Sequence, residues 1–229
     1  MEKRSSEIEI FAVSRDGEQK KADEIICEEE VVVRTDGEIH KFYCIPTDLE
    51  GMILGNLKSR GIGPSFLKTR EIADNEFNVG LSFAKGLMEN TQKCESNRKL
   101  TSKEVFNSVE MLNENSFLFQ KTGCTHVIEI CGDGEFFVED TSSHCAMDKA
   151  IGIAIREGID LSNSLLVTSC RQTASTIKNA FFCGIPIVIS IAAAADLAVK
   201  EADEYRIPLI GFANSKRFNI YSHQWRIKI

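Results

Sequence analysis

The chain lacks several features that would assign it to a common class of protein. No apolar run among its 229 residues is long enough to cross a bilayer as a helix, and the start, MEKRSSEIEIF, lacks the apolar core of a signal peptide. The eight cysteines are scattered and no two form C-x-x-C, which argues against zinc-ribbon and thioredoxin-type sites. We therefore expect a cytoplasmic protein with reduced thiols, no structural metal and no contact with a membrane.

Charge is unevenly distributed along the sequence. There are 27 Lys and Arg against 34 Asp and Glu, a formal net charge of −7, which argues against general binding to nucleic acids. Residues 206–229, however, include five Lys or Arg and no Asp or Glu. There the apolar run 208–212 predicts a buried strand, followed by a basic loop over 213–217. Such a loop at the carboxyl end of a strand suits a phosphorylated ligand, and a solvated surface turn is the alternative.

The first part of the chain, residues 1–83, predicts a small α+β unit with hairpins. Residues 1–23 are weakly patterned, so we expect at most one strand there, over 8–13. The elements expected after it are a hairpin over 28–44, a helix from a capping box at 47–50 to about Lys58, and two strands over 66–72 and 76–83.

Residues 84–100 have neither helical nor strand periodicity and predict a mobile loop. Cys94 lies in its middle, near Lys93, Arg98 and Lys99. Cations near an exposed cysteine lower the pKa of its thiol and make it reactive. Cys94 is therefore a candidate nucleophile, and an incidental thiol in a linker is the alternative.

Residues 101–229 predict an α/β domain with a mixed, largely parallel sheet, because strands alternate there with helices of 10–15 residues. A capping box at 101–104 predicts a first helix to about Asn113. Strands are expected within 122–130 and over 135–138, 164–168, 185–191 and 208–212, and helices over 144–155, 172–182 and 194–205.

Three strand ends should lie along one edge of this sheet, because parallel strands share a direction. They are followed by Arg171, by the small residues 192–195 and by the loop 212–217. Arg171, Lys216 and Arg217 would attract an anionic ligand, and backbone N–H groups of residues 213–216 would add donors. Tight packing of helix on sheet is the alternative explanation of the small residues.

His126 and His144 are candidates for acid–base or ligand roles, although a lone histidine is more often structural. A zinc deaminase needs H-x-E together with C-x-x-C. Here Val127 and Ile128 follow His126, so the sequence argues against that class of enzyme.

Four ordered motifs resemble the FdhD/NarQ family of formate dehydrogenase accessory sulfurtransferases. They are TGCTH (122–126), ED-x-x-x-H-x-A-x-DK-x-x-G (139–152), the loop with Ser169 and Arg171, and GF-x-x-x-x-RFNIYSH (211–223), and residues 46–50 resemble the family's TPxDLE-like segment. The resemblance implies a cytidine-deaminase-like α/β core without the zinc. It also implies transfer of sulfur, carried as a cysteine persulfide, from a cysteine desulfurase to the molybdenum or tungsten bis-molybdopterin guanine dinucleotide cofactor of formate dehydrogenase.

Within this resemblance Cys94 is the sulfur-carrying residue, and the cofactor is bound as a substrate. The residues implied in its binding are His126, Arg171, Phe212, Ala213, Asn214, Ser215, Lys216 and Arg217. The expected partners are a cysteine desulfurase and the catalytic subunit of formate dehydrogenase, and the family suggests a homodimer.

The chain departs from the family pattern at two places. The family's mobile loop typically has C-x-x-C, whereas this one has only Cys94, and the family's DVGRH reads DTSSH at 140–144. The missing second cysteine leaves a cofactor-binding chaperone without sulfur-transfer activity as the alternative function. A regulatory nucleotide-binding module is a third.

Overall fold

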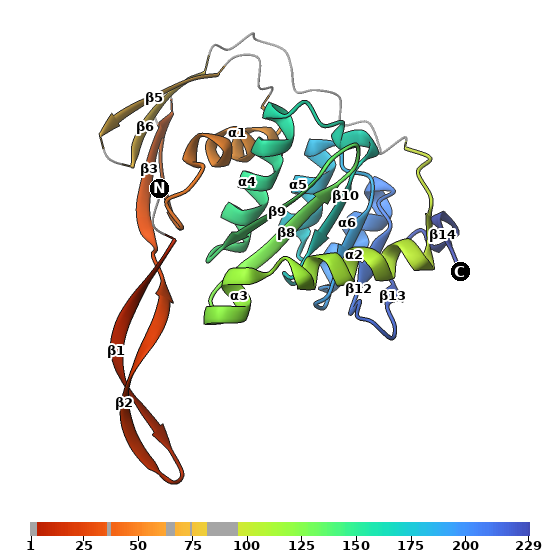
Figure 1. The fold of residues 1–229 in the computed structure, drawn as a ribbon. Helices are drawn as coiled ribbons and strands as arrows, with labels where there is room; N and C mark the ends of the chain where they lie inside the picture. Colours follow the sequence, from red (N-terminus) through yellow and green to blue (C-terminus); the bar gives the residue numbers. More distant parts are fainter. Residues whose placement is uncertain (1–3, 36–37, 63–66, 74, 82–95) are drawn as a thin grey trace.

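The computed structural model describes residues 4–35, 38–62, 67–73, 75–81 and 96–229. Figure 1 shows a projecting β-hairpin, a small sheet with helix α1, and a larger sheet between layers of helices. Within these ranges no helix combines the length and the apolar character needed to span a bilayer.

The N-terminal hairpin corrects the expectation of at most one strand in residues 1–23. β1 (Ser5–Ser14) and β2 (Gly17–Ile26) pair antiparallel along their whole length and project as a ribbon (Figure 1). Most of its side chains are exposed, Phe11 and Val13 among them. Because neither face is buried, the sequence carries no strict alternation of apolar and polar residues from which the strands could be predicted.

A four-stranded sheet follows, in the order β4–β3–β6–β5, and confirms the two predicted strand pairs. Its strands are β3 (Glu29–Thr35), β4 (Glu38–Cys44), β5 (Leu67–Ala73) and β6 (Glu76–Leu81). Helix α1 (Leu49–Ser59) packs on it through Met52 and Leu57. The predicted capping box is wrong, because the N-cap is Asp48 in a left-handed conformation without a side-chain cap. Asp48 Oδ1 instead pairs with Arg156 at 2.6 Å.

Helix α1 lies against helix α4 (Ser143–Arg156) with glycine at the contact. A Cβ atom at Gly55 would lie 1.8 Å from the carbonyl oxygen of Asp148. Cys145 of α4 also belongs to the core of the four-stranded sheet. The division into units 1–83 and 101–229 stays a prediction, and this contact joins the two.

The larger sheet has six strands in the order β13–β12–β11–β10–β8–β9. The strands are β8 (His126–Cys131), β9 (Glu135–Asp140), β10 (Leu165–Thr168), β11 (Val188–Ser190), β12 (Leu209–Gly211) and β13 (Asn219–Ile220). The expected mixed α/β fold is confirmed. Within this sheet, parallel pairing is confined to β10, β11 and β12, and antiparallel strands lie on both sides of them.

Helices cover both faces of this sheet (Figure 1). α4, α5 (Ala174–Cys183) and α6 (Asp196–Tyr205) contribute to one apolar core, and α2 (Ser102–Glu114) contributes to the other. The capping box of α2 is confirmed: Thr101 and Glu104 exchange side-chain to backbone bonds. The short helix α3 (Phe117–Thr122) was not predicted, and it has no buried residue that would create an apolar stripe.

A buried arginine near the end of the chain, Arg226, donates hydrogen bonds to backbone carbonyl groups of two earlier segments. Arg226, 1 % exposed, donates from Nε to the carbonyl oxygen of Arg98 at 3.0 Å and from Nη1 to that of Arg206 at 3.1 Å. Just beyond it, β14 (Ile227–Lys228) pairs in parallel with β7 (Leu100–Thr101). Two short 3₁₀ helices, Leu161–Asn163 and Gln224–Arg226, complete the elements described.

Candidate functional site

The carboxyl ends of β10, β11 and β12 lie together, as their parallel direction predicts. Backbone hydrogen bonds join the segments that follow them. Gln172 N–H donates to Ala193 O at 2.8 Å, and Phe212 N–H donates to Ala192 O at 2.9 Å. The small residues 192–195 therefore lie between the other two segments, where backbones approach closely.

A cavity of about 490 Å³ opens beside these strand ends. Arg171, His126 and His144 contribute to its wall, together with Ser143, Cys170, Gln172, Thr173, Thr176 and residues 193–195. The first turns of α4 and α5 reach the same cavity through His144 and Thr176. Because helix N-termini carry partial positive charge and Arg171 carries a full one, this cavity suits an anion.

His126 lies between that cavity and a second one of about 500 Å³. The second cavity is mainly apolar and is lined by residues of α2 and α3, with Leu112, Phe119 and Ile191 in its wall. Burial, followed by the charge of Arg171, lowers the pKa of His126, and Asp140 acts in the opposite direction. The imidazole is therefore neutral near pH 7 and can accept or donate a hydrogen bond.

The loop 212–217 forms a closed turn beside these cavities and lines neither of them. Asn214 Oδ1 accepts the N–H groups of Lys216 at 2.9 Å and Arg217 at 3.2 Å, and the N–H of Ala213 donates to Ser190 O. The expectation that the backbone N–H groups of 213–216 are available to a ligand is therefore wrong for Ala213, Asn214 and Lys216.

The loop exposes side chains to solvent. Phe212, Asn214, Ser215, Lys216 and Arg217 are exposed, whereas Ala213 is buried in the core. Phe212 adopts a left-handed conformation, φ 51°, and its ring lies 6.0 Å from the guanidinium carbon of Arg217. The structure thus brings Arg171 and His126 to one cavity and places the ring and two cations of the loop at the end of β12, on the other side of residues 192–195.

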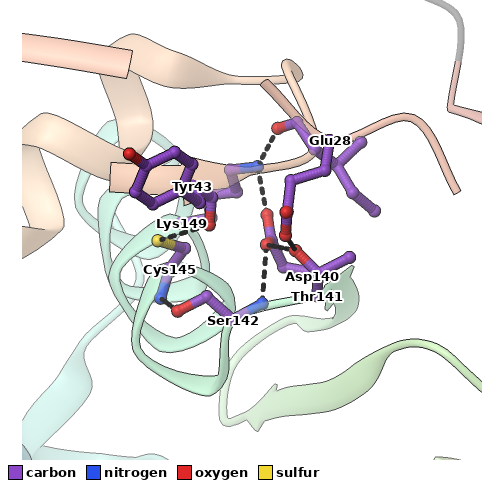
Figure 2. Close-up of polar contacts among 8 residues, drawn as sticks. Glu28, Tyr43, Asp140, Thr141, Ser142, Cys145 and Lys149 are labelled. Carbon is purple, nitrogen blue, oxygen red and sulfur yellow. Dashed lines mark hydrogen bonds and ion pairs between the residues drawn. The ribbon is translucent and has the colours of Figure 1, made fainter. Parts of the chain in front are cut away.

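Two residues of the ED…DK motif, Asp140 and Lys149, form a buried ion pair near the start of α4 (Figure 2). Lys149 Nζ lies 2.5 Å from Asp140 Oδ2 and donates to Ile45 O at 2.6 Å. Asp140 Oδ1 accepts the N–H of Ser142, the N-cap of α4, at 3.0 Å. Burial raises the pKa of Asp140, and the charge of Lys149 opposes that shift. The pair fixes the start of α4, and hence His144, relative to β8 and β9.

The predicted nucleophile, Cys94, lies outside the described residues, as do residues 82–95 around it. Its role stays a prediction. Among the cysteines that the structure describes, Cys124 is exposed and lines the second cavity, Cys27 and Cys131 are half-buried, and Cys44, Cys145, Cys170 and Cys183 are buried.

Sequence reasoning named Ser169 only as part of a family motif, and it did not identify Ser142 and Thr173 as helix caps. Ser169 Oγ accepts the N–H of Val127 at 2.9 Å and so holds the start of β8 next to β10. Ser142 and Thr173 cap the two helices that point at the cavity. A signal was present for both caps, since each is a hydroxyl residue within two positions of the start of a predicted helix, 144–155 or 172–182.

The fold and the site define a mixed α/β protein with a cavity at the carboxyl ends of its parallel strands. The chain belongs to the FdhD/NarQ family, whose family model matches residues 76–228. It is 28% identical to the sulfur carrier protein FdhD of Methanothermobacter thermautotrophicus over 243 residues, 96% of this chain and 98% of that protein.

Two further comparisons agree with this assignment. The sulfur carrier protein FdhD of Thermoplasma acidophilum is 34% identical over 138 residues, 59% of this chain and 49% of that protein. The crystal structure of a formate dehydrogenase accessory protein from Desulfotalea psychrophila superposes with a TM-score of 0.86 at 19% identity, over 98% of this chain and 99% of that one. At that identity the superposition supports the fold alone.

Proposed function

We propose that this protein is a sulfur carrier that serves formate dehydrogenase. The observation that carries the proposal is the similarity to a relative named as a sulfur carrier, which extends over 96% of this chain and 98% of the relative. A cofactor-binding chaperone without sulfur transfer was the alternative, and the names of the relatives do not favour it.

In this proposal the sulfur is carried on Cys94 and comes from a cysteine desulfurase. The Cys94 thiolate attacks the outer sulfur of the donor's persulfide, a new S–S bond forms, and the donor's cysteine leaves as a thiolate. The exchange is redox-neutral and needs no further reactant. Basic neighbours in the sequence, Lys93 and Arg98, favour the attacking thiolate.

The proposed acceptor is the molybdenum or tungsten bis-molybdopterin guanine dinucleotide cofactor, bound as a substrate. Its phosphates match the charge of Arg171 and the N-termini of α4 and α5. Lys216 and Arg217 are two further cations at the end of β12, beyond residues 192–195, and the exposed ring of Phe212 is a flat surface for a guanine base. His126, neutral and half-buried, supplies a hydrogen bond between the two cavities.

The partners and location follow from this role. We infer contacts with a cysteine desulfurase and with the catalytic subunit of formate dehydrogenase, in the cytoplasm, by a protein that forms a homodimer and retains a cytidine-deaminase-like core.

The test is transfer of labelled sulfur. The protein is incubated with a cysteine desulfurase and sulfur-labelled cysteine, and protein-bound label is measured before and after reduction. We expect label on the wild type that a reductant releases, no label on Cys94→Ala, and normal label on the matched variant Cys124→Ser. An unlabelled wild type would overturn the proposal and leave the chaperone.

A further inference from the structure

Three side chains with metal-binding atoms converge at the end of β8 that is remote from His126. Glu129 and Cys131 are two residues apart on β8 and so point to the same face of the sheet. Glu135 is the direct antiparallel partner of Cys131 on β9. The Cys131 sulfur and one carboxylate oxygen from each glutamate all lie within 4.8 Å of one another.

Glu129 is the unusual member of this cluster. Its side chain is fully buried, 0 % exposed, and neither of its carboxylate oxygens has a hydrogen-bond donor among the described residues. Its register partner on β10 is Val167, and the core on this face of the sheet is apolar. A buried carboxylate without donors is strongly unfavourable unless a proton or a cation neutralises it.

A proton shared between Glu129 and Glu135 is the alternative explanation, and it leaves the approach of the Cys131 sulfur to both carboxyl groups unexplained. Burial, then the nearby charge of Glu135 and a hydrogen bond with its side chain, raise the pKa of Glu129 to about 8, so the carboxyl can be neutral at pH 7. Burial and the same two carboxylates also raise the pKa of the Cys131 thiol, and Arg98 opposes them. A divalent cation would contact all three groups at once and would neutralise the buried carboxylate of Glu129.

We propose that Glu129, Cys131 and Glu135 bind one zinc ion. A thiolate favours zinc over magnesium or calcium, which prefer sites made only of oxygen, and carboxylates are also zinc ligands. Ligand atoms at about 2.0–2.3 Å from a tetrahedral zinc lie about 3.5 Å apart, so the three side chains need only a small rotamer adjustment. Glu135 is exposed, which leaves the fourth position open to water.

The sequence expectation of no structural metal rested on the missing C-x-x-C pair. These three ligands instead combine an i, i+2 pair on one strand with a partner across the Gly132–Gly134 turn, a spacing that this motif does not cover. The zinc would link β8 to β9 at the end of the hairpin opposite to His126. The proposal is therefore independent of sulfur transfer.

The test uses the full-length protein, freed of metal with a chelator and then titrated with Zn²⁺ against a coloured chelator and separately with Co²⁺. We expect one equivalent of each and, for Co²⁺, a thiolate-to-metal charge-transfer band in the near ultraviolet. Glu129→Gln and Cys131→Ser should each lower the affinity more than about tenfold, since even outer partners of a metal site contribute that much.

Two controls keep the result specific. Cys124→Ser, another accessible thiol, and Glu114→Gln, an exposed carboxylate on α2, should bind zinc like the wild type. Glu135 is exposed, so Glu135→Gln is a second ligand variant that should fold normally. A wild type without the cobalt–thiolate band, or Glu129→Gln and Glu135→Gln variants that bind zinc as tightly as the wild type, would overturn the proposal.

Discussion

A Cβ atom placed on Gly152 of α4 would lie 1.8 Å from the carbonyl oxygen of Gly51 in α1. The two helices therefore touch backbone to backbone, and Gly55 makes the same kind of contact with Asp148. Gly152 is the last residue of the ED…DK-x-x-G motif. Its role is to let the N-terminal unit approach the helix whose first turn reaches the cavity.

The first prediction is that Gly152→Ala destabilises the protein. In an ordinary helix this change is stabilising by about 0.5–1 kcal/mol, but here the added methyl group must push two helices apart, at a cost of about 1–3 kcal/mol or more. Urea unfolding measures the difference. Asn107→Ala, an exposed position on α2, is the control and should change little. A Gly152→Ala protein as stable as the wild type would contradict the close contact.

The buried pair Asp140–Lys149 gives a second prediction. Lys149→Met leaves the Asp140 carboxylate buried without its cation, so we expect a loss of about 3–5 kcal/mol of unfolding free energy. The double variant Asp140→Asn/Lys149→Met should lose less than the sum of the two single variants, because it removes both charges.

The control for this prediction is an exposed ion pair. Lys200 lies 3.5 Å from Asp196 on the surface of α6, and Lys200→Met should cost no more than about 0.5 kcal/mol. Equal effects of Lys149→Met and Lys200→Met in the same urea series would show that the buried pair contributes no more to the unfolding free energy than the exposed pair does.

A third prediction concerns pH. Burial raises the pKa of Asp148 to about 7, against the hydrogen bonds from Asn56 and Ser59 and the charge of Arg60. The native carboxyl then keeps its proton between about pH 4 and 7 while the unfolded one loses it. Its contribution to stability is therefore largest below pH 4, falls as the pH rises toward 7, and is constant above that.

Asp148→Asn should remove this dependence. Relative to the wild type, the variant should gain stability between pH 4 and 7, by an amount on the order of a few kcal/mol at most. Urea midpoints measured across that range test the prediction, and Asp16→Asn, at an exposed site in the turn between β1 and β2, serves for comparison. A wild type and variant whose difference stays constant with pH would count against it.

The fourth prediction concerns nucleotide binding at the strand ends, with GDP as the probe. Arg171→Ala, and separately Lys216→Ala/Arg217→Ala, should weaken binding by about 1–3 kcal/mol per lost charge-assisted contact, and added salt should weaken binding to the wild type. Calorimetry measures the affinities, with the exposed Lys200→Ala as control. Unchanged affinity in the double variant would make the loop 212–217 an ordinary surface turn.

The fifth prediction concerns the order in which the thiols react. We expect a maleimide to label Cys94 before Cys131, Cys170 and Cys183. Burial raises the pKa of these last three thiols and so lowers the fraction of reactive thiolate. Because Cys124 is exposed, the kinetics should be measured in a Cys124→Ser background, with mass spectrometry to identify the labelled peptide. Slower labelling of Cys94 than of Cys183 would remove the carrier assignment.

A helix or strand could be predicted from the sequence when it buries one regular face. The helices over 144–155, 172–182 and 194–205 and the alternating strands were predicted because their apolar residues follow a regular period. The β1–β2 ribbon and α3 were missed because neither buries a regular face. The same limit applies to the site. The position of the strand ends could be predicted because parallel strands share one direction. The hydrogen bonds within the loop 212–217 could not, because they depend on the conformation of one side chain, that of Asn214.

The anchoring of Arg226 has a consequence for the order of events during synthesis. Its guanidinium binds the carbonyl of Arg98, a residue made 128 positions earlier. At ordinary translation speeds that interval is on the order of ten seconds. Until Arg226 is made, the carbonyl group of Arg98, and later also those of Pro186 and Arg206, lack its guanidinium, and residues 100–101 lack β14 as a pairing partner. The nascent chain therefore presents an open strand edge to the ribosome and its chaperones until Arg226 has emerged.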